Sequence, residues 1–167
     1  GLNPADVVFT NADDDDRSTI TVTTTADVAD GDTSSLWALW NSRGADGHIS
    51  LREAMLAANA TANGSGGADR IHFDIAGAGV QTIAPLSALP TITQALVLDA
   101  QTQPGFVAQP LIELNLQGAG ALTGGLWVNA SDSTVRGLIV NRASGAGIFV
   151  GSDNASIQNI TLQGNFV

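Results

Sequence analysis

An internal repeat in the C-terminal half constrains the fold most strongly. Residues 126–141 align with residues 148–163 at an offset of 22 positions. Large apolar residues fall on large apolar residues, and short polar residues fall on short polar ones; the aligned pairs include Leu126 with Ile148, Trp127 with Phe149, Val128 with Val150 and Val135 with Ile157. Each unit holds short β-branched runs separated by Gly, Asn, Ser and Asp. This pattern is typical of one coil of a parallel β-solenoid.

We therefore expect an all-β fold: a right-handed parallel β-helix of about 22 residues per coil, with one capping α-helix before it. The handedness follows the usual sense of parallel crossovers. Stacked coils would place like residues directly over one another, about 4.8 Å apart. Earlier strands are expected at residues 71–75, 81–84, 92–99 and 111–116. A leucine-rich repeat has a similar period, but its L-x-x-L-x-L frame is not evident.

One strong helix is predicted directly after residue 50. Ser50 and Glu53 form an S-x-x-E capping box before an apolar run at helical spacing, Leu51, Met55 and Ala58. A helix of about ten residues is marginal alone, so its apolar stripe is expected to cover the first coil. We divide the chain into an acidic extension (1–47) that packs on or caps the solenoid, a capping helix with a glycine hinge (48–67), and β-helix coils (68–167).

The C-terminal end of the solenoid is expected to be open. The sequence TLQGNFV is still in pattern, so further coils or another chain would cover this end. The residues predicted to mediate self-association are Ile157, Ile160, Leu162, Phe166 and Val167.

The N-terminal extension carries acidic clusters. Asp27, Asp30 and Asp32 could offer oxygen ligands to Ca²⁺, although no EF-hand frame is present. A solvated acidic loop is the alternative, and no other cofactor is indicated.

Four aromatic residues are candidates for surface positions. Trp37 and Trp40 lie in SSLWALWNS, where they either pack on the solenoid or form a platform for a glycan. Alternation along the strand directs Trp127 and Phe149 outward.

The composition narrows the function classes. The formal net charge is -10, with six Arg and no Lys, so nucleic acid is an unsuitable partner. No apolar run approaches the length of a membrane span. No P-loop, G-x-S-x-G or H-E-x-x-H motif occurs, and the solenoid carries no convincing carboxylate pair. We therefore expect a protein that is not an enzyme and has no catalytic residues.

A family resemblance agrees with this interpretation. The segments ISLREAMLAAN, GADRIHFDI, LPTIT, AQTQPGF and STVRGLIV resemble the bacterial CSLREAI-domain proteins, in which a C-S-L-R-E-A-I motif precedes parallel β-helix repeats. Ile49 stands where the family has cysteine, and Met55 stands where it has isoleucine. The resemblance covers the chain from about Thr21 onward. It implies an extracellular, structural or adhesin-like module.

The expected function is thus a non-catalytic structural or adhesive module of a bacterial secreted or cell-surface assembly. Such a module would associate head-to-tail through its open C-terminal coil. The alternative is a glycan-binding or polysaccharide-active protein of the lyase or hydrolase kind.

Overall fold

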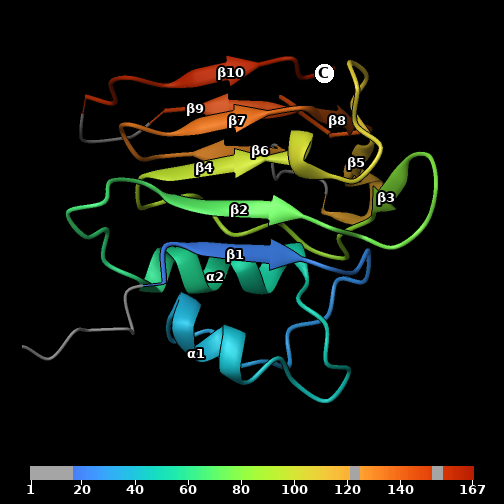
Figure 1. Ribbon diagram of the computed structural model, residues 1–167. Helices are drawn as coiled ribbons and strands as arrows, with labels where there is room; N and C mark the ends of the chain where they lie inside the picture. Colours follow the sequence, from blue (N-terminus) through green and yellow to red (C-terminus); the bar gives the residue numbers. More distant parts are fainter. Residues whose placement is uncertain (1–16, 121–124, 152–155) are drawn as a thin grey trace, which may run out of the picture.

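The computed structural model describes residues 17–120, 125–151 and 156–167. Within them it contains two α-helices, α1 (Leu36–Asn41) and α2 (Leu51–Ala60), and ten short strands (Figure 1). The strands are β1 (Thr19–Val22), β2 (Asp69–Phe73), β3 (Gln81–Ile83), β4 (Leu96–Asp99), β5 (Ile112–Asn115), β6 (Leu126–Val128), β7 (Thr134–Arg136), β8 (Leu138–Asn141), β9 (Ile148–Val150) and β10 (Thr161–Gln163). Two 3₁₀ turns, η1 (Ala100–Thr102) and η2 (Leu116–Gly118), follow β4 and β5.

The expectation of an all-β right-handed β-helix is wrong. Helices and strands are mixed, and the described strands form three small sheets that do not close into a solenoid. The sheet orders are β1-β2-β4-β7-β10, β3-β5-β8 and β6-β9, and every strand pair in them is parallel. The strands are only three to five residues long, and the segments between them are mostly irregular. The fold is therefore a layered α/β arrangement.

The expected spacing of 22 residues holds for one strand pair and fails for the next. In β6 and β9, Leu126 pairs with Ile148, as the repeat predicted. In β7 and β10, however, Val135 pairs with Leu162 and not with Ile157. The connection before β10 is longer than the one before β7, which shifts the alignment. Two left-handed residues mark matching turns ahead of these strands, Asp132 and Asn159, each with φ 58°.

Parallel pairing in register stacks like side chains into apolar columns. The column of the five-stranded sheet contains Ile20, Ile71, Leu98, Val135 and Leu162. The column of the three-stranded sheet contains Ile83, Leu114 and Val140. All but Leu162 are buried. Each fully buried side chain of this size contributes about 1.5–3 kcal/mol to stability, so these columns form the core.

Helix α2 covers the β1 end of the stacked layers (Figure 1). Its predicted capping box is present: the Ser50 hydroxyl accepts from the Glu53 N–H at 3.2 Å, and the Glu53 carboxylate accepts from the Ser50 N–H at 2.9 Å. The expected apolar stripe of Leu51, Met55 and Ala58 is buried. No helix in the described ranges is long and apolar enough to cross a membrane.

Helix α1 was not predicted. It spans only six residues, fewer than two turns, so apolar periodicity is too short to identify it. Ser35 caps it by accepting from the Ala38 N–H at 3.0 Å. Leu36 and Leu39 are fully buried, and α1 packs against α2 on the side away from the sheets (Figure 1).

Candidate functional site

The candidate functional site is the outer layer opposite the helices, formed by β9, β10 and residues 165–167; we call it the open layer (Figure 1). Its apolar side chains continue the core columns, but no described segment lies over them. Leu162 is 48% exposed, whereas its neighbour Val135 is fully buried. Val150 is 38% exposed above the buried Val128. The open layer therefore presents core-type residues to solvent.

The backbone of β10 is also half unpaired. The Thr161 N–H donates to the Ser133 carbonyl at 2.9 Å, and the Gly137 N–H donates to the Gln163 carbonyl at 3.1 Å. Backbone groups of successive residues in a strand point to opposite sides, so the N–H and C=O of Leu162 face away from β7. β10 is the last described strand of its sheet. Such an edge is a template for another strand.

Three of the predicted self-association residues lie exposed in the open layer. Besides Leu162, Phe166 is 50% exposed and Val167 is 74% exposed. Phe166 is fixed above β8, because its N–H donates to the Leu138 carbonyl at 2.8 Å and its carbonyl accepts from the Val140 N–H at 2.7 Å. Ile157 and Ile160 are only partly exposed, and Ile160 packs against the core.

Trp127 and Phe149 point outward, as alternation along the strands predicted. Their rings meet edge to face, with centroids 5.2 Å apart and planes at 86°. The Trp127 indole N–H donates to the Gly151 carbonyl at 3.0 Å. An aromatic pair of this geometry contributes about 0.5–1.5 kcal/mol beyond its buried area, so these residues stabilise the β6–β9 register.

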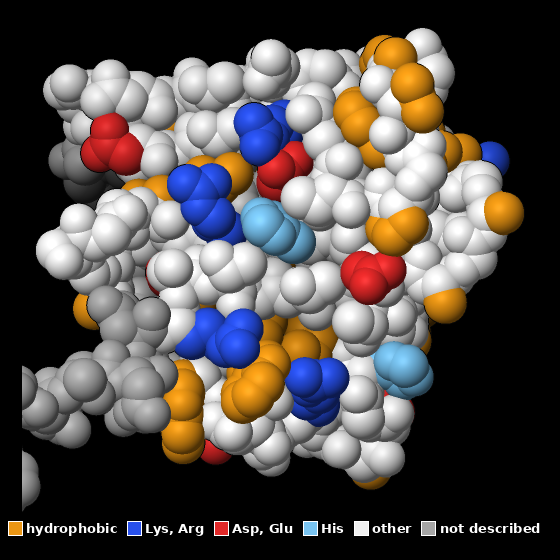
Figure 2. Space-filling model, in the orientation of Figure 1, with side chains coloured by type: hydrophobic (Ala, Val, Ile, Leu, Met, Phe, Trp, Pro, Cys, Tyr) orange, Lys and Arg blue, Asp and Glu red, His pale blue; other side chains and the backbone are white. Residues whose placement is uncertain are grey.

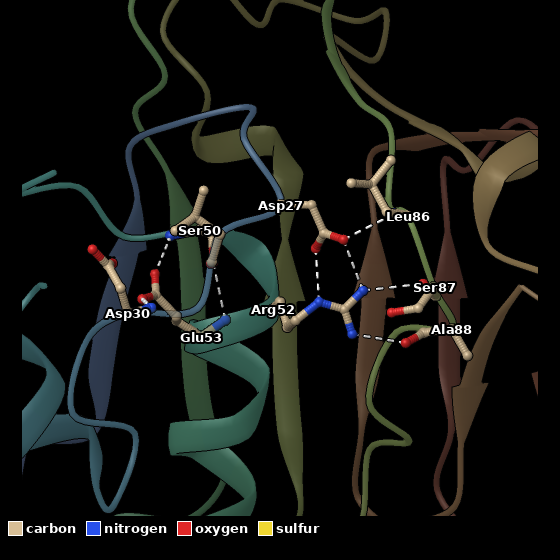
Figure 3. A network of polar contacts seen from close by, with 9 residues as sticks. Asp27, Asp30, Ser50, Arg52, Glu53, Leu86, Ser87 and Ala88 are labelled. Atoms are coloured by element: carbon tan, nitrogen blue, oxygen red, sulfur yellow. Dashed lines mark hydrogen bonds and ion pairs between the residues drawn. The ribbon is translucent and has the colours of Figure 1, made fainter. Parts of the chain in front are cut away.

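A buried carboxylate organises the N-terminus of α2 (Figure 3). Glu53 is 1% exposed, and its carboxylate accepts three backbone N–H groups: those of Asp30 at 2.9 Å, Gly31 at 2.8 Å and Ser50 at 2.9 Å. The Ser50 hydroxyl in turn donates to the Val28 carbonyl at 2.5 Å. Glu53 thus holds the loop before α1 against the start of α2.

Asp27 and Arg52 form a second polar junction beside the first (Figure 3). Arg52 Nε lies 2.8 Å from the Asp27 carboxylate, which also accepts the Leu86 N–H at 2.9 Å. Arg52 donates further to the carbonyls of Ser87 at 3.0 Å and Ala88 at 2.8 Å. Burial raises the pKa of Asp27, but hydrogen bonds from Arg52 and Leu86 and the charge of Arg52 outweigh that effect and lower it. This junction ties the segment after β3 to α2.

The three aspartates suggested as calcium ligands are bound to different partners. Asp27 pairs with Arg52, the Asp30 carboxylate accepts the Ala45 N–H at 2.7 Å, and Asp32 accepts the Ser34 N–H at 3.0 Å. The Ser34 hydrogen bonds lower the pKa of Asp32. Among the described residues, no group of three His, Asp or Glu side chains is arranged to hold a metal ion.

Other acidic side chains on the sheets also serve in polar ladders. Asp99 pairs with Arg136 at 2.5 Å, and this contact raises the pKa of the arginine. Glu113 accepts from the Thr82 hydroxyl at 2.5 Å and from the Asn141 amide at 2.6 Å. These two hydrogen bonds lower the pKa of Glu113. Asp99 and Glu113 therefore stabilise strand stacking.

Trp40 lies beside a small pocket that the sequence did not reveal. The guanidinium carbon of Arg17 is 4.4 Å from the indole centroid, and that of Arg43 is 6.0 Å away. Trp37 is exposed to a similar degree as Trp40, 41% against 43%. The sequence has an arginine on each side of SSLWALWNS, and this could have suggested a cation–π contact. Only the fold shows that both arginines lie over the indole of Trp40.

Comparisons of the chain with family models, curated proteins and solved structures found no match. The resemblance to CSLREAI-domain proteins stays a prediction from the sequence.

Proposed function

We propose that this chain is a non-catalytic structural or adhesive module of a bacterial secreted or cell-surface assembly, and that it associates through the open layer. The carrying observation is the contrast in exposure along one column. Ile20, Ile71, Leu98 and Val135 are at most 1% exposed, whereas Leu162 at the end of the same column is 48% exposed. A further strand layer would continue the column.

The occupant that fits the open layer is another layer of parallel strands. The outward-facing backbone groups of Leu162 would pair with a new strand, and Phe166 and Val167 would be covered by its side chains. We commit to a second copy of this chain, joined head to tail: the edge of β10 in one copy would pair with the edge of β1 in the next, since β1 is the other outermost described strand of the five-stranded sheet. Contacts of this kind join different surfaces and generate filaments when they do not close.

We propose a non-catalytic module because the carboxylates on the helices and sheets make structural contacts. Glu53, Asp27 and Asp99 hold backbone groups or arginines, and Glu113 holds Thr82 and Asn141. The extracellular setting rests on the resemblance of ISLREAMLAAN to the CSLREAI motif and on the acidic, lysine-free composition.

Sedimentation velocity over a concentration series tests the proposal with a matched pair of variants. Leu162→Arg places a charge in the centre of the open layer, and because Leu162 is half exposed, the monomer should remain folded. Val80→Arg makes the same change in the loop between β2 and β3, at a side chain that is 50% exposed. We expect larger species for the unmodified chain and for Val80→Arg, and only monomer for Leu162→Arg. Equal behaviour of the two variants would refute the assigned surface.

A further inference from the structure

A second surface, separate from the open layer, has the properties of an anion-binding site. A pocket of about 130 Å³ is lined by Arg17, Thr21, Thr23, Trp40, Arg43 and Ile49. It lies where the start of β1 meets the loop that follows α1. A small pocket of this size has room for a carboxylate or sulfate group.

The two arginines in this pocket differ in their described partners from the arginines elsewhere on the sheets and helices. Arg52 and Arg136 are neutralised by Asp27 and Asp99. Among the described residues no carboxylate pairs with Arg17 or Arg43. Arg17 donates instead to the Thr19 carbonyl at 3.0 Å, and Arg43 donates to the Trp40 carbonyl at 3.2 Å. Two positive charges thus converge in a chain whose net charge is -10.

The indole of Trp40 orients these charges. Arg17, at 4.4 Å from the ring centroid, lies within the range of a cation–π interaction, and Arg43 lies at its limit. A guanidinium on an aromatic face keeps the N–H groups along its edge available. That edge matches two oxygens of a carboxylate or sulfate. Trp40 therefore holds donors in place for an oxyanion.

Further polar and basic side chains lie beside the pocket on the outer face of the five-stranded sheet. Thr21 of β1 pairs with His72 of β2, and Thr19 pairs with Arg70. Arg70 is exposed and His72 is half-buried. Figure 2, which has the orientation of Figure 1, shows several basic and His side chains over this sheet, with acidic side chains among them. A chain with repeated negative groups could contact the pocket and Arg70 together.

We propose that this surface binds an acidic polysaccharide, with one carboxylate or sulfate group of the sugar in the pocket between Arg17 and Arg43. The hydroxyl groups of Thr19 and Thr21 suit the hydroxyls of a sugar. Trp37 and Trp40 are three residues apart on α1, so their partly exposed indoles lie on neighbouring parts of its surface and can contact sugar C–H groups. An acidic peptide would use the arginines but offers no ring of hydroxyls, so the observations favour a saccharide.

Isothermal titration calorimetry on the full chain tests the proposal with four probes: a uronate oligosaccharide, a sulfated oligosaccharide, a neutral oligosaccharide and a glutamate-rich peptide. We expect saturable binding of one or both acidic saccharides, weakened by added salt. Arg17→Gln and Arg43→Gln should each reduce the affinity about tenfold, the lower end for a lost charge-assisted hydrogen bond. Arg142→Gln removes an exposed charge elsewhere and should leave the affinity unchanged.

Each result of the titrations either supports or refutes the proposal. Binding of the uronate alone or of the sulfated probe alone identifies which oxyanion the pocket accepts, and either supports the proposal. Equal binding of the peptide or of the neutral probe refutes an acidic saccharide. Equal loss of affinity in Arg17→Gln and Arg142→Gln refutes the pocket. Thermal melting of each variant shows whether it is folded. If Arg17→Gln does not fold, the affinity of Arg43→Gln still tests the pocket. The two proposals can fail separately: sedimentation of Leu162→Arg tests the open layer, which contains no residue of the pocket, and the calorimetry tests the pocket beside β1.

Discussion

Glu53→Ala is expected to destabilise the chain strongly. It removes the acceptor of three backbone N–H groups, those of Asp30, Gly31 and Ser50. A hydrogen bond to a charged group contributes about 1.5–3 kcal/mol. Water can reach the exposed loop at Asp30 and recover part of this, so we expect a loss of about 3–5 kcal/mol in the free energy of unfolding. That is a large share of the 5–15 kcal/mol typical of a domain.

Urea denaturation followed by circular dichroism measures this loss, and two comparisons sharpen it. Glu53→Gln keeps one carbonyl oxygen for the Asp30 and Gly31 N–H groups but turns a donor toward Ser50, so it should lose less, about 1–2 kcal/mol. Glu113→Ala removes a carboxylate from the surface and should cost below about 1 kcal/mol. A loss for Glu53→Ala no greater than that for Glu113→Ala would refute the role assigned to this carboxylate.

Two further predictions concern the ion pair of α2 and the close stacking of β6 on β9. The pKa of Asp27 is lower in the folded chain than its ordinary value of 3.8, so its stabilising effect is present above that pH and is lost as the pH falls through the lower folded pKa. Unfolding measured from neutral to acidic pH should show this loss, and Asp27→Asn should remove it; an unchanged pH profile in the variant would contradict it. A Cβ on Gly125 would lie 1.7 Å from the Gly147 carbonyl oxygen, whereas a Cβ on Gly66 would meet nothing within 4 Å. Gly125→Ala should therefore destabilise the chain by more than about 2 kcal/mol and Gly66→Ala by less than about 0.5 kcal/mol in thermal melts; similar melting temperatures would count against the β6–β9 stacking.

The sequence predicted those local structures that depend on only a few residues. The S-x-x-E pattern at Ser50 located α2, because the capping box needs only those two side chains and an apolar stripe. The match of Leu126 with Ile148 gave the β6–β9 register. Helix α1 escaped prediction, because Leu36 and Leu39 are too few to establish a helical period.

The register of β10 could not be predicted from a constant repeat, because the connections between strands vary in length. A shorter sequence match would have given the correct register of β10 on β7. TVRG at residues 134–137 resembles TLQG at residues 161–164, and these two segments pair in the structure. Both glycines have positive φ, 74° at Gly137 and 61° at Gly164, so each allows the turn that follows its strand. The fold class was wrong for a related reason, since the repeat covers only the last strands and says nothing of α1 and the three separate sheets.

The candidate sites depended on contacts across long sequence distances. Asp27 and Arg52 are 25 residues apart, and the sequence suggested Asp27 as part of a solvated loop, with a metal ligand as the second possibility. Arg17 meets Trp40 only because β1 runs beside α1 and the loop after it. Of the five residues predicted to mediate self-association, Leu162, Phe166 and Val167 are exposed, whereas Ile157 and Ile160 are partly buried. Their role in association stays a prediction.

The most direct test of the central claim is amide hydrogen exchange at Leu162, followed by NMR at increasing protein concentration. Its N–H faces away from β7 and should exchange quickly in the monomer, while the N–H of Thr161, bonded to Ser133, should be protected throughout. If copies of the chain pair through the open layer, the Leu162 amide becomes protected as the concentration rises. An amide at Leu162 that exchanges equally fast at every concentration, in a sample that forms larger species, would show that association occurs elsewhere.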